Sequence, residues 1–126
     1  GYLNLGIYYA SLGKFRQARE EFLRARERYI IYKWGYPMPI ELDLNLARVN
    51  LQLKSFAEAE KYTHQYLQVI PESSEGLLLL GKIYQEKDEV KLAEETYLKI
   101  QGGGVASAKA QNNLGILYIL LYFVLV

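Results

Sequence analysis

Residues of the types that carry out catalysis are sparse in this sequence. Among 126 residues there is no cysteine and one histidine, His64, which excludes a thiol nucleophile and a zinc–thiolate site. No group of metal ligands accompanies His64, so we expect it to have a surface or packing role on a helix. Adjacent acids such as Glu20–Glu21 and Glu94–Glu95 would point in different directions from a helix and are expected to be solvated. The sequence therefore favours a protein that acts through its surfaces, without catalysis, metal or cofactor.

Phosphate and nucleic-acid binding are also disfavoured. The triple glycine Gly102–Gly104 lacks the lysine and hydroxyl of a phosphate-binding loop, and we interpret it as a linker. Five arginines cluster in one expected helix, at Arg16, Arg19, Arg24, Arg26 and Arg28. Acidic residues are interleaved with them and the net charge is +1, so this stretch predicts a solvated helix face. We expect neither a nucleic acid nor a small-molecule substrate.

The elements that position the other side chains are organised as a repeat. A leucine followed by a small residue occurs four times, at Leu5-Gly6, Leu46-Ala47, Leu80-Gly81 and Leu114-Gly115. The last three pairs share a spacing of 34 residues, whereas the first precedes the second by 41, which indicates a seven-residue insertion. Apolar residues recur at helical spacing around each pair, and the first three pairs are followed by a second such stretch. The sequence therefore predicts antiparallel helix pairs.

Turn residues set the expected limits of these helices. Gly13, Pro71 and the triple glycine mark three of the breaks between them. The expected ranges are about 1–12, 15–31, 40–53, 56–70, 74–87, 90–101 and 106–126.

This pattern resembles the tetratricopeptide repeat, which has a period of 34 residues. The resemblance rests on the Leu-Gly-x-x-Tyr spacing, on the mid-repeat turn and on the second-helix alanines Ala18, Ala59 and Ala93. Asn50 stands where the family has tyrosine, and Lys54 and Asp88 replace the turn glycine. The resemblance implies an all-α fold, a right-handed superhelical solenoid of about 3.5 repeats. We expect one domain over 1–126, divided at about 1–32, 33–39 (the insertion), 40–73, 74–107 and 108–126.

In such domains the first helix of each repeat lines a concave groove, which implies a binding site. The position before each Leu-small pair is Asn4, Asn45, Leu79 and Asn113, so three repeats place asparagine there. In several family members this position forms a ladder that holds a peptide backbone, because a carboxamide both donates and accepts hydrogen bonds. The alternative is an exposed polar residue at a helix surface. Leu79 interrupts the ladder.

Other groove positions follow from the same resemblance. The expected contacts are Ile7, Arg48, Gln52 and Lys82, together with Leu3, Ser11, Leu44, Leu78 and Glu86. This mixture suits an extended peptide with apolar side chains and occasional acidic groups. The clamp that some family members use for a chaperone's C-terminal carboxylate is disfavoured, because its Lys-x-x-x-Asn and Lys-x-x-x-Arg pairs are missing here.

The insertion is a second candidate surface. Aromatic residues gather in and around it, at Tyr29, Tyr32, Trp34 and Tyr36, followed by Pro37-Met38-Pro39. These residue types dominate interface hot spots, so Trp34 and Tyr36 are candidate partner-binding residues. The alternative is that the loop folds back and packs between the first two repeats.

The C-terminal stretch is apolar and without charge. Residues 114–126 are too few for a bilayer span, which needs about 20 residues. Three interpretations remain open: a helix buried by a partner or a further repeat, the start of a membrane segment, and a stretch that is not native to the protein.

The sequence thus predicts a non-catalytic scaffold that binds a partner protein or an extended peptide. A weaker resemblance, in the order Lys91 to Tyr97, the triple glycine and a new Leu-Gly helix, is to the type IV pilus pilotins. It implies a periplasmic, outer-membrane-associated assembly factor in place of a cytoplasmic protein. A third alternative is the interaction arm of a larger enzyme or complex.

Overall fold

The computed structural model describes residues 1–31 and 38–125, and within these ranges it consists of helices without strands. The helices are α1 (Tyr2–Ser11), α2 (Phe15–Ile31), α3 (Ile40–Gln52), α4 (Phe56–Val69), α5 (Ser74–Glu86), α6 (Val90–Leu98) and α7 (Val105–Leu125). The predicted all-α fold is confirmed, and every helix end lies within three residues of its expected position. The largest difference is at α6, which ends at Leu98; beyond it, the backbone N–H groups of Lys99 and Ile100 bond three residues back instead of four.

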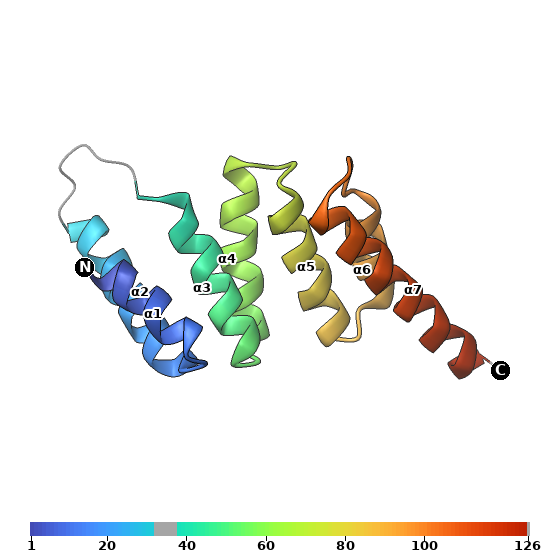
Figure 1. The fold of residues 1–126 in the computed structure, drawn as a ribbon, viewed down its shortest axis with the longest axis horizontal. Coiled ribbons are helices and arrows are strands. Elements are labelled where there is room, and N and C mark those ends of the chain that lie inside the picture. The colour runs from blue at the N-terminus through green and yellow to red at the C-terminus, as the bar shows by residue number, and fades with distance from the viewer. Residues whose placement is uncertain (32–37, 126) are drawn as a thin grey trace. The chain divides into compact units, whose positions relative to one another are not determined.

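The chain separates into two compact units, Gly1–Val69 and Ile70–Val126. In the first unit α1 packs against α2, α3 against α4, and the two hairpins meet chiefly through α2 and α3. In the second unit α5 packs against α6, and α7 lies against both. Figure 1 shows α1/α2, α3/α4 and α5/α6 as antiparallel pairs, one pair for each of the first three predicted repeats.

Two glycines bring the helices of their hairpins close together. Gly6 lies against the ring of Phe22, and a Cβ atom at this glycine would be 2.5 Å from the ring carbon Cε1. Gly81 lies in the same way against the ring of Tyr97. In the second repeat the equivalent residues are Ala47 and Thr63, both fully buried. A larger residue on the first helix is thus matched by a smaller one on the second, which keeps the interior filled.

The turn inside each hairpin has one left-handed residue. It is Gly13 (φ 74°) in the first repeat, and Lys54 (φ 59°) and Asp88 (φ 60°) in the next two. The next residue's N–H bonds to the carbonyl five residues earlier, as in Ser55 to Asn50 at 2.8 Å, which is the Schellman arrangement that closes a helix. The two substitutions of the family's turn glycine therefore keep the turn at the cost of a conformation that side chains disfavour.

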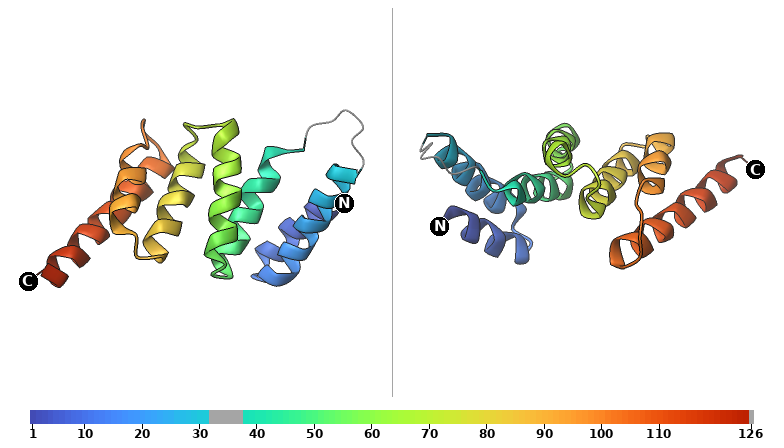
Figure 2. Two further views of the ribbon diagram at one scale, coloured as in Figure 1. Left: turned by 180° about the vertical axis from the view of Figure 1, so that it is seen from behind. Right: turned by 90° about the horizontal axis from the view of Figure 1, so that it is seen from above.

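Helix α7 is the first helix of the fourth predicted repeat. Its inner face is buried in the second unit through Ala110, Leu114 and Leu117. Figure 2 shows that the second half of α7 extends beyond α5 and α6, and large side chains on its other face, such as Ile119 and Phe123, are exposed. Along the parts of the chain that are described, no helix is long and apolar enough to cross a membrane.

Candidate protein-binding surface

Exposed and half-buried side chains lie along α1 and α3 in the first unit. Asn4 and Ile7 on α1 are exposed, as are Arg48 and Gln52 on α3, and Asn45 is half-buried. Asn4 is equivalent to Asn45, and Ile7 to Arg48, in two successive hairpins of the same construction. Because α1 packs against α3 and equivalent positions of stacked repeats point the same way, these five residues form one surface. We call it the α1–α3 face.

The α1–α3 face combines amide, aliphatic and cationic side chains. Asn4 and Asn45 each present a donor and an acceptor, which match the two groups of a peptide bond. Ile7 is 48% exposed and offers an apolar contact, while the Arg48 guanidinium offers a charge-assisted hydrogen bond to a carboxylate. Leu44, expected beside them, is buried and contributes to the core instead.

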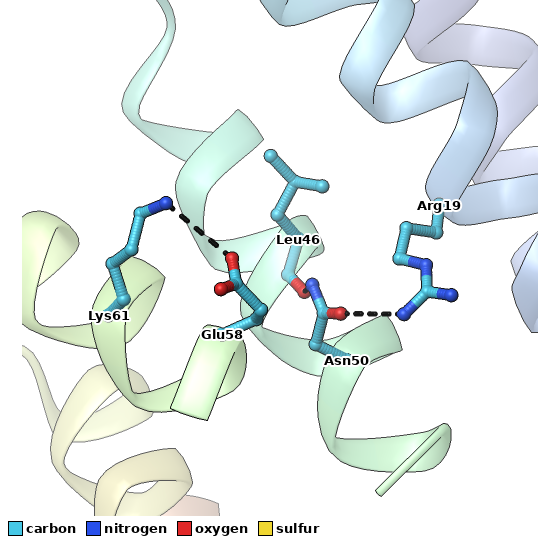
Figure 3. A network of polar contacts seen from close by, with 5 residues as sticks. All are labelled: Arg19, Leu46, Asn50, Glu58 and Lys61. Carbon is cyan, nitrogen blue, oxygen red and sulfur yellow. Dashed lines mark hydrogen bonds and ion pairs between the residues drawn. The ribbon is translucent and has the colours of Figure 1, made fainter. Parts of the chain in front are cut away.

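A buried polar network holds α3 in place behind this face. The Asn50 side chain is 2% exposed; its Nδ2 donates to the carbonyl of Leu46 at 2.8 Å, and its Oδ1 accepts from Arg19 Nη1 at 3.1 Å. The same Arg19 nitrogen donates to Ser55 Oγ at 3.2 Å. Figure 3 shows Arg19 reaching from α2 to Asn50 on α3. Asn50 thus stands where the family has tyrosine, and its buried amide oxygen accepts a hydrogen bond from Arg19 of the preceding repeat.

The arginines of α2 are less solvated than their sequence pattern predicts. Arg19 and Arg26 are half-buried, and the Arg26 guanidinium lies 5.8 Å from the ring centre of Tyr62. Glu21, which was expected to be solvated, is buried and pairs with Arg24 at 2.6 Å, so that expectation is wrong for this acid. The prediction of a solvated face is therefore wrong for part of this helix, because its inner residues pack against α3 and α4.

Asp43 lies in the first turn of α3, near this arginine group. Burial raises the pKa of its carboxyl from 3.8, and the positive charge of Arg26 partly opposes that rise. The folded first unit therefore holds the Asp43 proton more tightly than an exposed aspartate would.

The second unit carries the predicted groove residues Lys82 and Asn113. Lys82 is half-buried on α5. Asn113 on α7 is half-buried and its Nδ2 donates to the Tyr97 hydroxyl at 3.4 Å, while that hydroxyl donates to Gln85 Oε1 at 2.9 Å. Burial of the hydroxyl is the main reason that the pKa of Tyr97 rises to about 12, so it remains a neutral donor at physiological pH. Asn113 thus has an internal partner that ties α7 to α6.

The remaining predicted positions differ in their surroundings. Leu78 and Leu79 are buried in α5. The expected partner-binding residues Trp34 and Tyr36 lie outside the described residues, so they stay predictions. His64 is half-exposed on α4, with its Nε2 3.5 Å from Glu60 Oε1. Within residues 1–31 and 38–125 no three acidic, histidine or cysteine side chains come together in a way that could hold a metal ion.

These features define the class of protein: a repeat of helix hairpins whose first helices present a side-chain surface. A family model described as the tetratricopeptide repeat matches residues 3–68, more than half of the chain, so the chain belongs to this family. Its repeats generally mediate contacts between proteins, typically without catalysis. No curated protein matches the sequence. The resemblance to pilotins stays a prediction.

Proposed function

We propose that the chain is an interaction scaffold that binds an extended peptide segment of a partner protein on the α1–α3 face. The observation that carries this proposal is the equivalent placement of Asn4 and Asn45 on two adjacent first helices. Two carboxamides on neighbouring helices, whose axes lie about 8–10 Å apart, match peptide groups about three residues apart in an extended strand, and this contact does not depend on the strand's sequence.

Side-chain preference on this face comes from the neighbours of the asparagines. Ile7 favours an apolar residue of the ligand, because it is a half-exposed aliphatic group beside the ladder. Arg48 favours an aspartate or glutamate one repeat further along. The proposed ligand is therefore an extended segment with an apolar residue and an acidic residue on the same side.

A random-peptide phage library selected on the immobilised chain would supply ligands for the test. For the selected peptides, Asn45→Ala is expected to weaken binding about tenfold, equivalent to about 1.4 kcal/mol, in isothermal titration calorimetry. His64→Ala is the matched control, because this half-exposed polar side chain lies on α4, away from the α1–α3 face.

Equal affinity of Asn45→Ala and wild type for every selected peptide would contradict the proposed site. Arg48→Glu adds a test of specificity: it is expected to reverse the preference for acidic peptides, and an unchanged preference would contradict the assigned role of Arg48.

A further inference from the structure

The second half of α7 has an uncovered apolar face opposite its buried one. This α7 outer face consists of Gly115, Ile116, Ile119, Tyr122 and Phe123, which share one side of the helix at spacings of three and four residues. Ile119 is 58% exposed and Phe123 73%, whereas Leu114 and Leu117 on the other side are buried. A helix that is apolar on both sides is stable in water only when both sides are covered.

Gly115 of this face occupies the repeat position at which, elsewhere in the chain, a glycine contacts an aromatic ring. Gly115 is equivalent to Gly6 and Gly81, which lie against the rings of Phe22 and Tyr97 from an antiparallel helix. At Gly115 no atom lies within 4 Å of where a Cβ atom would be. The structure therefore presents a notch of the kind that receives an aromatic ring twice in this chain.

The same helix carries the Phe123 ring, which could reach the Gly115 notch of a second copy. If two α7 helices lie antiparallel about a twofold axis at Ile119, residue 115 of one copy faces residue 123 of the other. Phe123 of each copy then lies over Gly115 of its counterpart, and the two Ile119 side chains meet at the centre. Residues 110–126 contain no charged side chain, so the twofold axis brings no like charges together.

We propose that a second copy of this chain docks on the α7 outer face, through an antiparallel pair of α7 helices. Covering the exposed apolar side chains of both copies would remove on the order of 1,000 Å² from water, about the lower limit for a specific interface. We expect a dissociation constant in the micromolar range, on the order of 10 µM. This interface lies in the second unit and does not depend on peptide binding by the α1–α3 face in the first.

Sedimentation-velocity ultracentrifugation of the 126-residue chain across a concentration series tests the proposal. Wild type is expected to change from monomer to dimer, and Ile119→Glu to remain monomeric, because the substitution places two carboxylates opposite each other. Leu98→Glu is the matched control: Leu98 is 60% exposed, lies on α6 of the same unit and is outside the α7 outer face, so this variant is expected to dimerise like wild type. Far-ultraviolet circular dichroism checks that both variants remain folded.

Mixing variants tests whether the Ile119 side chains of the two copies meet, and Gly115→Ala tests the antiparallel register that places Phe123 over Gly115. Ile119→Glu and Ile119→Lys are each expected to be monomeric alone and to form a one-to-one dimer when mixed, because the opposed charges then attract. Gly115→Ala is expected to weaken the dimer at least tenfold by obstructing the ring, although alanine favours the helix itself. A monomeric wild type at all concentrations would overturn the proposal, as would equal dimerisation of Ile119→Glu and Leu98→Glu. Sedimentation of a monomer with phosphatidylcholine vesicles would overturn it in favour of a lipid surface.

Discussion

Replacing Gly6 with alanine tests how the first hairpin is held together. The added Cβ atom would lie 2.5 Å from Cε1 and 2.6 Å from Cδ1 of Phe22, whereas carbon atoms prefer separations of about 3.5–4.0 Å. The ring must therefore move by about 1 Å, and it is 1% exposed, so its surroundings must move with it.

The expected cost follows from two opposing effects. Overpacking a filled interior costs about 1–3 kcal/mol, and the severe overlap at Gly6 places the cost near the upper value. Alanine is favoured over glycine within a helix by about 1 kcal/mol. We therefore expect Gly6→Ala to reduce the free energy of unfolding by about 2 kcal/mol, and Gly81→Ala to do so at least as strongly, because hydrogen bonds to Gln85 and Asn113 anchor the Tyr97 ring.

Urea unfolding followed by far-ultraviolet circular dichroism measures this difference. Gly115→Ala is the matched control, measured at a concentration at which the chain is monomeric: this glycine has open space around it, so the substitution is expected to stabilise by about 1 kcal/mol. Phe22→Leu in the Gly6→Ala background should cost less than in wild type, because the smaller side chain makes room for the methyl group. Stabilisation by Gly6→Ala, or strict additivity with Phe22→Leu, would refute this account of the close approach.

Three further predictions concern the turns, the buried network and the ionisable groups. Lys54→Gly and Asp88→Gly are each expected to raise the free energy of unfolding by about 1 kcal/mol in urea titrations, because they release left-handed strain; Gly13→Ala, with nothing near its Cβ position, should lower it by a similar amount. Arg19→Ala is expected to cost about 1–3 kcal/mol by leaving the buried Asn50 oxygen without its donor, and a double-mutant cycle with Asn50→Leu should show coupling; independent effects would argue against the network. The raised pKa of Asp43 means that its ionised form destabilises the fold above the folded pKa, a penalty that disappears as the pH falls towards 3.8. Asp43→Asn should therefore have a higher urea midpoint than wild type at neutral pH, and the two midpoints should converge as the pH falls towards 3.8. A lower midpoint for the variant at neutral pH would show that the carboxylate stabilises the fold.

Much of the fold could be predicted from the sequence because local signals mark it. Apolar residues at helical spacing indicate the helices, and Gly13 and Pro71 mark the ends of α1 and α4 to within one residue, whereas α6 ends three residues before the expected position. The substitutions of turn glycine by Lys54 and Asp88 could be recognised from their place in the repeat, and both residues adopt the left-handed conformation that glycine would favour.

The contacts between hairpins could not be predicted in this way. Asn50 was recognisable as a departure from the family, but its donor Arg19 lies 31 residues earlier, on a helix whose arginines alternate with acids as they do on solvated faces. Asn113 looked like a ladder residue, yet its amide donates to Tyr97, 16 residues earlier. Such pairs depend on how one helix lies against another, which periodicity along a single helix does not specify.

Chemical-shift mapping by nuclear magnetic resonance tests the proposed peptide site most directly. The 14.6 kDa chain would be labelled with nitrogen-15 and titrated with a selected peptide that has an apolar and an acidic residue. The account predicts that the largest changes fall on the backbone and side-chain amides of the α1–α3 face, including the carboxamides of Asn4 and Asn45. Changes concentrated on α2 and α4, with those two carboxamides unaffected, would contradict it.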